Sequence, residues 1–329
     1  MAGGQERTLR RRIRSVESTR KITRAMELIA ATRVVKAQDR AAEARPYSEQ
    51  ITAMILDLVR AGAAKNHPLL RENPDATKAA IIVVTSDRGL CGGYNSSVIR
   101  MAEREIKAAE AAGQDYSLIV IGTKGEKYFR FRGYRIDAHF SKMSDKPTYE
   151  DARQIAASFR EHFESGELST VDLAYTRYIN SSSQEAVVRR FLPLVVDVGE
   201  SDAGSGAGPS GDLEYEPSPS GILDAILPRY VEARILSALL DASAAEQAAR
   251  QRAMKAATDN ADELKTKLTR IMNRARQDSI TTEIMEIVSG AEALKDDKGA
   301  PVDLLLDRLT PEHLFPEHLD PTDHLASQH

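Results

Sequence analysis

The glycine-rich segment at residues 86–95, SDRGLCGGYN, is the first place where residue types and spacing suggest chemistry. It follows an apolar run and precedes a helical pattern, so Gly89, Gly92 and Gly93 would let backbone amides approach a phosphate. Its spacing matches neither G-x-G-x-x-G nor G-x-x-x-x-G-K-[ST]. A tight strand-to-helix turn is therefore favoured over nucleotide binding. The run Gly122–Gly125 also lacks both motifs and predicts a turn that opens a helix.

The sequence contains no convincing set of residues for nucleophilic or metal-based catalysis. Cys91 is the only cysteine, which excludes an intramolecular disulfide and a zinc site built on several thiolates. No histidine lies near it in the sequence, so a small residue packed in the turn is favoured over a nucleophile. Four of the seven histidines lie in the acidic C-terminal stretch, without a repeating acid–histidine spacing. The sequence predicts no catalytic residue, no cofactor and no metal site.

The two ends of the chain carry apolar residues at helical spacing, which predicts a long helix at each end. The N-terminal stripe comprises Leu9, Ile13, Val16, Ile22, Met26, Ile29, Tyr47, Ile51, Met54 and Leu58. The C-terminal stripe comprises Ile222, Ile226, Tyr230, Ile235, Leu239, Leu264, Leu268, Ile271 and Ala275. Pro46 is expected to kink or break the first helix, and Pro228 to lie in an early turn that tolerates it. The Ala-rich run 241–257 favours close approach of a partner helix, so an antiparallel coiled coil is expected.

The middle of the chain changes to strand-like periodicity. Apolar runs at 79–85, 117–121, 171–179 and 187–198 predict strands, and 96–112 and 149–165 predict helices. This alternation is typical of a Rossmann-like α/β domain with a mostly parallel sheet. The expected fold class is α/β plus long helices. Its parts are an N-terminal coiled-coil helix (1–62), the α/β domain (63–198), a Gly/Ser/Pro-rich acidic insertion (199–221), a C-terminal coiled-coil helix (222–294) and an acidic Pro-containing extension (295–329).

Charge and hydropathy exclude other classes of protein. The formal net charge of −4 argues against a dedicated nucleic-acid binder. The sequence contains no run of 18 apolar residues, so no membrane-spanning helix is expected. Residues 1–45 carry twelve Lys and Arg against five acids, which favours an anionic partner surface. This basic segment also resembles a mitochondrial presequence, but Glu6 and Glu17 interrupt it and the helical pattern continues too far. We therefore interpret this segment as part of the mature protein rather than as a cleaved presequence, and we expect a prokaryotic, cytoplasmic protein.

Four separated segments resemble the gamma subunit of bacterial F-type ATP synthases. They are RIRSVESTRKITRAMELIA at 12–30, SDRGLCGGYN at 86–95, AMKAATDNA at 253–261 and ARQDSITTEIMEIVSGAEAL at 275–294. The resemblance implies the same architecture and a non-catalytic central rotor shaft. Its partners would be three alpha and three beta subunits, the epsilon subunit and the membrane c ring, with the catalytic sites on beta. It implies a peripheral position on the cytoplasmic face of the cell membrane, without direct membrane insertion or nucleic-acid binding.

The resemblance also implies contact residues. Those expected to touch the alpha–beta ring are Lys21, Arg24, Met26, Arg276, Gln277 and Thr281. Tyr215 and Glu216 are expected near the c ring and epsilon. The residues alone would suggest a solvated helix face for the charged positions and a core position for Met26.

Other interpretations remain open. The main alternative is an α/β nucleotide-binding protein with coiled-coil dimerisation arms, and another is nucleic-acid binding by the basic N-terminal helix. The insertion at 199–213 is expected to be slack rather than a c-ring contact. The extension at 295–329 is expected to be mobile, with docking of 302–309 on the ring as the sharper alternative. One cysteine cannot form a redox-regulated disulfide, so thiol gating is not expected.

Overall fold

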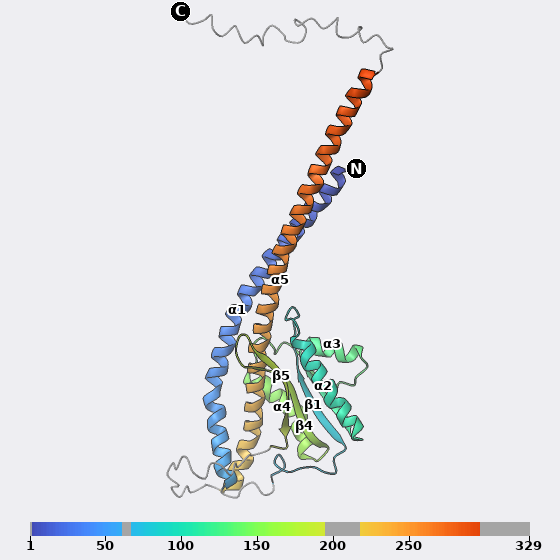
Figure 1. Ribbon diagram of the computed structural model, residues 1–329. Helices are drawn as coiled ribbons and strands as arrows, with labels where there is room; N and C mark the ends of the chain where they lie inside the picture. Colours follow the sequence, from blue (N-terminus) through green and yellow to red (C-terminus); the bar gives the residue numbers. More distant parts are fainter. Residues whose placement is uncertain (1, 61–66, 195–217, 297–329) are drawn as a thin grey trace, which may run out of the picture. The chain divides into compact units, whose positions relative to one another are not determined.

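The computed structural model describes residues 2–60, 67–194 and 218–296 (Figure 1). The chain divides into two compact units. The larger unit is Val16–Glu263, and the smaller unit combines Met1–Ser15 with Leu264–His329. The two long helices, α1 (Ala2–Arg60) and α5 (Pro219–Asp296), contribute residues to both units. Tyr215 and Glu216, most of the 199–221 insertion and most of the 295–329 extension lie outside the described residues.

Neither proline ends its helix, although the sequence predicts a kink or a break at Pro46 and an early-turn position for Pro228. Helix α1 continues through Pro46, so the expected break is absent. Helix α5 begins at Pro219, which places Pro228 in the helix interior rather than in its first turn. A proline inside a helix removes one hydrogen bond and crowds the preceding turn. Buried residues follow each proline, Ile51 and Ile55 after Pro46 and Val231 after Pro228, and this packing offsets the local loss.

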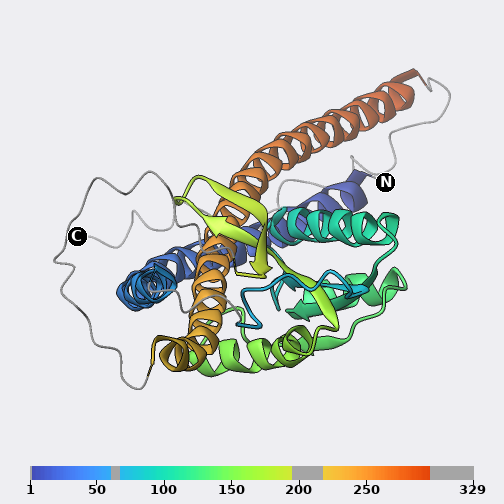
Figure 2. The ribbon, with the colours of Figure 1, turned by 90° about the horizontal axis from the view of Figure 1, so that it is seen from below.

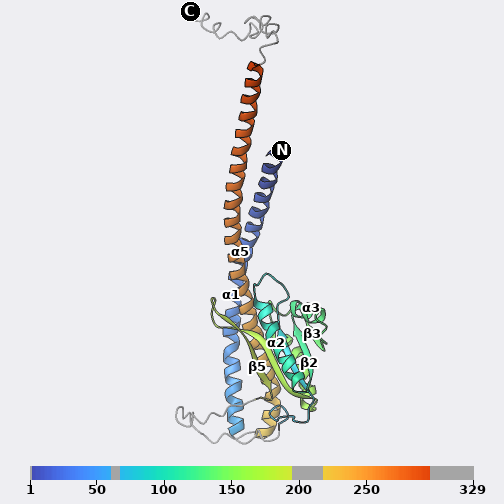
Figure 3. The same ribbon diagram turned by 45° about the vertical axis from the view of Figure 1, so that its right-hand side comes forward.

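Helices α1 and α5 run antiparallel within Val16–Glu263, as predicted (Figures 1 and 3). The Thr258 hydroxyl donates to the Thr23 hydroxyl at 2.9 Å, and Arg20 pairs with Asp262 at 2.6 Å. The buried positions of α1 fall on one seven-residue repeat, which keeps a helix seam facing its partner. These positions are Thr23, Glu27, Ala30, Val34, Ala37, Ile51, Ile55 and Leu58.

The predicted N-terminal stripe is confirmed at Leu9, Ile51 and Leu58, which are buried, and is wrong at other positions. Ile22 and Ile29, expected in the helix pair, are exposed, as are Tyr47 and Met54. Small residues occupy the seam one position further along, at Ala30 for example, because they let the two helix backbones approach closely. The larger apolar side chains beside them remain on the outer surface of α1.

A five-stranded sheet forms the centre of the larger unit. Its strands are β1 (Lys78–Val84), β2 (Asp115–Ile121), β3 (Ala138–Phe140), β4 (Leu168–Tyr178) and β5 (Gln184–Leu192), in the order β3-β2-β1-β4-β5. All neighbours pair in parallel except β4 and β5, which pair antiparallel. The mostly parallel α/β domain is therefore confirmed. The sequence missed β3, whose three residues are too short to show a period.

Helices cover both faces of the sheet (Figure 2). On one face, α2 (Tyr94–Ala111) and α3 (Thr123–Phe131) pack on Ile81, Val83 and their neighbours. On the other face, α4 (Tyr149–Glu164) packs together with the end of α1 and the start of α5 in one apolar cluster. The C-terminal end of α1 and the start of α5 thus supply part of the core of the α/β domain.

The first two strands end in close contact at Gly122. A Cβ atom there would lie 2.2 Å from the Thr85 carbonyl oxygen, and Gly122 has a φ of +93°. The Thr85 hydroxyl accepts from the Gly125 amide at 2.9 Å and donates to the Ile121 carbonyl at 2.8 Å. The run 122–125 is therefore the turn that opens α3, as predicted from its lack of a phosphate-binding motif.

The smaller unit is mostly exposed helix. Leu9 and Leu268 are its buried apolar residues among the described positions. Every described α5 side chain from Thr281 to Leu294 is exposed. The exposed apolar members of α5 in this unit are Leu264, Ile271, Ile280, Ile284, Met285, Ile287, Val288 and Leu294. So much apolar surface on one helix favours burial against another protein.

Candidate functional site

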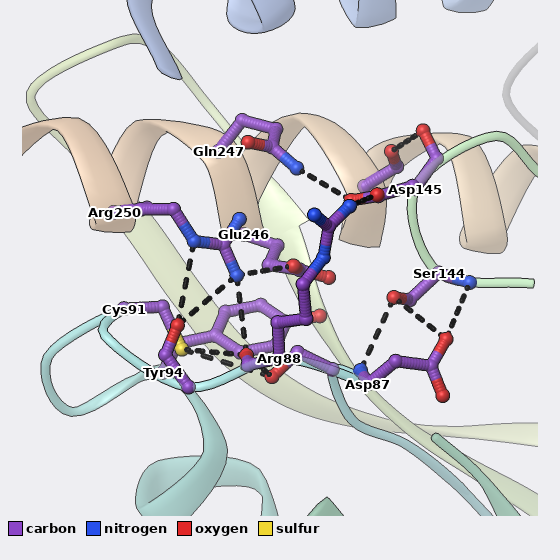
Figure 4. A network of polar contacts seen from close by, with 12 residues as sticks. Asp87, Arg88, Cys91, Tyr94, Ser144, Asp145, Glu246, Gln247 and Arg250 are labelled. Atoms are coloured by element: carbon purple, nitrogen blue, oxygen red, sulfur yellow. Dashed lines mark hydrogen bonds and ion pairs between the residues drawn. The ribbon is translucent and has the colours of Figure 1, made fainter. Parts of the chain in front are cut away.

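A buried ion pair joins α5 to the turn that follows β1. Arg250 donates to Glu246 at 2.6 Å, and the two side chains are only 8% and 1% exposed. The same guanidinium donates to the carbonyl oxygens of Arg88 at 3.1 Å and Gly89 at 3.4 Å (Figure 4). Burial raises the pKa of Glu246, and Arg250 partly opposes this rise. One cation therefore serves a carboxylate on the helix and two carbonyl groups of the turn.

Asp145, in the loop before α4, links the same turn to both long helices. Its carboxylate accepts from Gln247 of α5 at 3.0 Å and pairs with Arg33 of α1 at 3.2 Å. It also pairs with Arg88 of the turn. The Ser243 hydroxyl donates to the Asp145 backbone carbonyl at 3.3 Å. A single loop residue thus holds three separate elements together.

Asp87 fixes the turn to its neighbouring loops. Its carboxylate accepts from the amide of Thr123 at 3.2 Å and from the hydroxyl of Ser144 at 3.2 Å. Burial disfavours the charged form, but hydrogen bonds from Lys142, Thr123 and Ser144 outweigh it and lower the pKa of Asp87. Asp87 is therefore a structural acceptor, held ionised by backbone and side-chain donors.

Tyr94 and Cys91 complete the contact of the turn with α5. Both are buried in a small cluster with Ala245. The Tyr94 hydroxyl donates to the Ala242 carbonyl at 3.2 Å, and burial raises its pKa well above the usual value. The Cys91 sulfur lies 3.3 Å from the Asn95 amide nitrogen. Cys91 is a packed residue, as expected from the sequence, and the whole junction is suited to hold the sheet on α5.

The Cys91 thiol is expected to resist alkylation in the native protein. Burial raises its pKa, so little reactive thiolate forms near pH 8, and Cys91 is only 2% exposed. Iodoacetamide labelling followed by mass measurement should show slow modification in buffer and complete modification in urea. Fast labelling in buffer would contradict the packed position.

The predicted contact residues in the larger unit lie close together on α1. Lys21 and Arg24 are exposed, and Met26 is partly buried. Arg24 donates to Glu27 at 2.8 Å, and its side chain remains 57% exposed. Lys21 and Arg24 are therefore accessible cations, and Met26 is not a fully buried core residue.

The predicted contact residues in the smaller unit lie on α5. Arg276, Gln277 and Thr281 are all exposed. The Thr281 hydroxyl donates to the Gln277 carbonyl at 2.9 Å, within the helix. These positions are accessible to a partner. Tyr215 and Glu216 lie outside the described residues.

Sequence reasoning missed most of the junction. Glu246 and Arg250 were visible as a favourable i,i+4 pair, but nothing in their spacing showed that the pair is buried against the turn. Asp145 and Ser144 lie in a loop without a motif. Charged residues inside an Ala-rich helical run were the available signal, because such residues are rarely buried without partners.

Comparison with known proteins agrees with this architecture. The ATP synthase family profile matches residues 5–294. The chain belongs to the ATP synthase gamma chain family. The gamma chain of Frankia casuarinae is 50% identical over 295 residues, covering 88% of this chain and 98% of that one. The gamma chain of Parafrankia sp. is 46% identical with the same coverage.

Solved structures show the same fold as this gamma-chain family member. A chain in the structure of the Euglena gracilis mitochondrial ATP synthase, OSCP/F1/c-ring, has a TM-score of 0.61 at 18% identity. The match covers 92% of this chain and 98% of that one. Within the described residues, no helix combines the length and apolarity needed to cross a bilayer.

Proposed function

We propose that this chain is the central rotor shaft of an F-type ATP synthase. It couples ion flow through the membrane c ring to ATP synthesis or hydrolysis in the alpha–beta ring by rotation. Membership of the gamma chain family over residues 5–294 carries this proposal. In this role the chain is not catalytic, and the catalytic sites belong to the beta subunits. It would lie peripherally on the cytoplasmic face of the bacterial membrane.

The exposed apolar side chains support a shaft that turns inside a sleeve. Helix α1 exposes Ile22, Leu28, Ile29 and Val35, although the same helix buries smaller residues against α5. In the smaller unit, α5 exposes its own apolar series. A surrounding ring of subunits would cover these surfaces. Large side chains that project from a helix give apolar contact without a deep interlocking fit, which suits a bearing.

Each predicted segment of the chain has its own role in this proposal. Residues 1–62 and 222–294 make the shaft, and 63–198 make the foot that meets epsilon and the c ring. Lys21, Arg24 and Met26 contact the alpha–beta ring, where exposed cations attract acidic surfaces over a longer range than packing. The same role is proposed for Arg276, Gln277 and Thr281. Tyr215 and Glu216 contact the c ring or epsilon.

Co-expression with the alpha and beta subunits from the same source tests the rotor role. The expected product is an assembly of three alpha, three beta and one copy of this chain, active in ATP hydrolysis only as a complex. Size-exclusion chromatography and an ATPase assay measure both properties. A folded chain that stays alone would refute the role and favour the α/β nucleotide-binding alternative.

Alanine replacement of Arg276, Gln277 and Thr281 together is expected to impair the assembled complex without destabilising the chain. The three side chains are exposed, so the free energy of unfolding should change by less than about 0.5 kcal/mol per residue. Lost contacts with the ring should reduce ATP hydrolysis by roughly five- to tenfold. Urea denaturation of the chain and an ATPase assay of the complex measure the two effects.

A matched triple replacement on the α/β domain serves as the control. Arg104, Lys107 and Glu110 are exposed on α2. Their replacement by alanine should leave both stability and ATP hydrolysis near the wild-type values. Equal losses of activity in both triple variants would show that the α5 positions have no special role.

A further inference from the structure

A groove runs between helices α1, α4 and α5 within the larger unit. It combines two cavities of about 730 Å³ and 260 Å³, which share Tyr47 of α1 and Arg229 of α5 in their walls. We call it the tyrosine groove, and the wall residues that matter here are Tyr47, Met54, Tyr149, Arg153, Arg229 and Glu232. None of them belongs to the junction around Arg250, so the groove is a separate feature of the domain.

Large side chains of the kinds found in protein interfaces are exposed along this groove. Tyr47 is 49% exposed, Met54 is 51% exposed and Tyr149 is 41% exposed. Aromatic residues, methionine and arginine are enriched in the parts of a surface that other proteins cover. Three such apolar side chains on one groove therefore favour burial against a second protein.

A buried carboxylate fixes the orientation of Tyr149. The Tyr149 hydroxyl donates to Glu232 of α5, which is only 7% exposed. The Glu232 carboxylate also lies 4.0 Å from the Arg160 guanidinium. Burial and the hydrogen bond to Glu232 raise the pKa of Tyr149 to about 12, so the hydroxyl keeps its proton. A side chain that is already fixed loses little conformational entropy on binding, which suits Tyr149 to be an anchor.

Arg229 gives the groove an accessible positive charge. It is exposed and, across the described residues, belongs to no ion pair. Arg153 is already paired with Glu150 at 2.9 Å. Glu232 is engaged by the Tyr149 hydroxyl. The charge that remains for a partner is therefore one cation, which a carboxylate complements.

Pro228 adds a hydrogen-bond acceptor at the same groove. It lies inside α5 and lines the larger cavity together with Ala225. Proline has no amide hydrogen, so the Asp224 carbonyl four residues earlier lacks its usual helix donor. An N–H group of a bound protein segment would satisfy this carbonyl.

We propose that the tyrosine groove docks the epsilon subunit, through an apolar side chain that lies beside a carboxylate. The apolar side chain packs against Tyr47, Met54 and Tyr149. The carboxylate pairs with Arg229. This inference rests on the proposed function, because a groove on a turning shaft keeps a close-fitting occupant only if that occupant turns with it. The alpha–beta ring does not, and the c ring lies in the membrane, where an exposed arginine is costly.

Protection of an introduced thiol tests the docking on the full-length chain. Met54→Cys adds an exposed thiol to a chain whose own Cys91 is only 2% exposed. Saturating epsilon is expected to slow maleimide labelling of Met54→Cys at least about tenfold, because interface anchors are shielded from water. Phe131→Cys is the matched control, since Phe131 is 87% exposed on α3 and outside the groove. Its labelling rate should be the same with and without epsilon.

Three results would overturn the docking. The first is unchanged labelling of Met54→Cys in the presence of epsilon, including the case in which epsilon does not bind the chain. The second is protection by the c ring alone. The third is protection by a higher concentration of the chain alone, which would assign the groove to a second copy.

Affinity variants identify the contacts, with epsilon titrated into each chain by isothermal titration calorimetry. Arg229→Glu should weaken epsilon binding at least about tenfold. Lys255→Glu is the matched control, since Lys255 is an exposed cation on the same helix outside the groove, and should change affinity less than about twofold. Joint replacement of Tyr47 and Met54 by alanine should weaken binding at least about tenfold, with an unchanged circular dichroism spectrum. Equal effects of the two cation variants would refute the role of Arg229.

Assembly with alpha and beta separates this inference from the rotor role. A chain that assembles with alpha and beta into an active complex but binds no epsilon would refute the docking alone. A chain that binds epsilon at the groove but does not assemble with alpha and beta would contradict the rotor role instead.

Discussion

Gly122→Ala is expected to lower the free energy of unfolding by about 4 kcal/mol or more. The new Cβ would lie 2.2 Å from the Thr85 carbonyl oxygen, which belongs to the backbone and cannot rotate away. The positive φ of +93° adds strain for any residue with a side chain. The ends of β1 and β2 would have to separate, which disturbs the Thr85 hydrogen bonds as well. Urea denaturation followed by circular dichroism measures the loss.

Two other glycines serve as controls, because alanine there would strain the backbone without bringing a Cβ atom into contact with other atoms. Gly113 and Gly133 have φ values of +74° and +81°, and a Cβ at either would meet no atom within 4 Å. Alanine at these positions should therefore cost only about 1–2 kcal/mol. A Gly122→Ala variant as stable as these two would show that β1 and β2 do not approach as closely as described.

Arg250→Met is expected to destabilise the larger unit by about 3–5 kcal/mol at pH 8. The change removes the partner of the buried Glu246 carboxylate and the donor to the Arg88 and Gly89 carbonyls. A single charge then remains in a site where its carboxylate is 1% exposed. Chemical denaturation at several pH values measures the deficit relative to the wild type.

The deficit of Arg250→Met should shrink as the pH falls from 8 to 5. Burial already raises the folded-state pKa of Glu246, and loss of Arg250 removes a group that lowers it. The penalty for the buried carboxylate is full above the folded pKa and disappears as the pH falls through that pKa toward the unfolded value. The double variant Glu246→Gln with Arg250→Met carries no such charge, so its deficit should be smaller and nearly independent of pH. A pH-independent deficit in the single variant would refute an unpaired Glu246 as the cause.

The sequence predicted those parts of the fold that depend on local periodicity. Strand and helix patterns in the middle of the chain placed β1, β2, α2 and α4 within a few residues of their observed bounds. The short β3 was missed, because three residues show no period and its position depends on pairing with β2. The stripe predicted for α1 was correct at Leu9, Ile51 and Leu58 but misplaced by one position at Ile22 and Ile29, since apolarity alone favours these two over their small neighbours. Close backbone approach decides the seam, and it is a property of two helices together.

The candidate site was also predictable only where it depends on one short segment of the sequence. The turn at 86–95 was visible because glycines and a cysteine stand out in one sequence segment. Its partners Asp145, Glu246 and Arg250 come from distant segments, and only folding brings them to the turn. The contact residues Lys21, Arg24, Arg276, Gln277 and Thr281 came from family resemblance, and they remain predictions about partners.

Seven successive residues of α5, 242–248, are each no more than 2% exposed. Successive side chains point about 100° apart around a helix, so seven of them cover its whole circumference. Helix α5 is therefore buried on every side over these residues, so the α/β domain and α1 together surround it completely. The α/β domain and this stretch of helix must turn as one body, with no free angle between them. A torque applied to the domain would therefore rotate this part of α5 by the same angle, without slippage between the two.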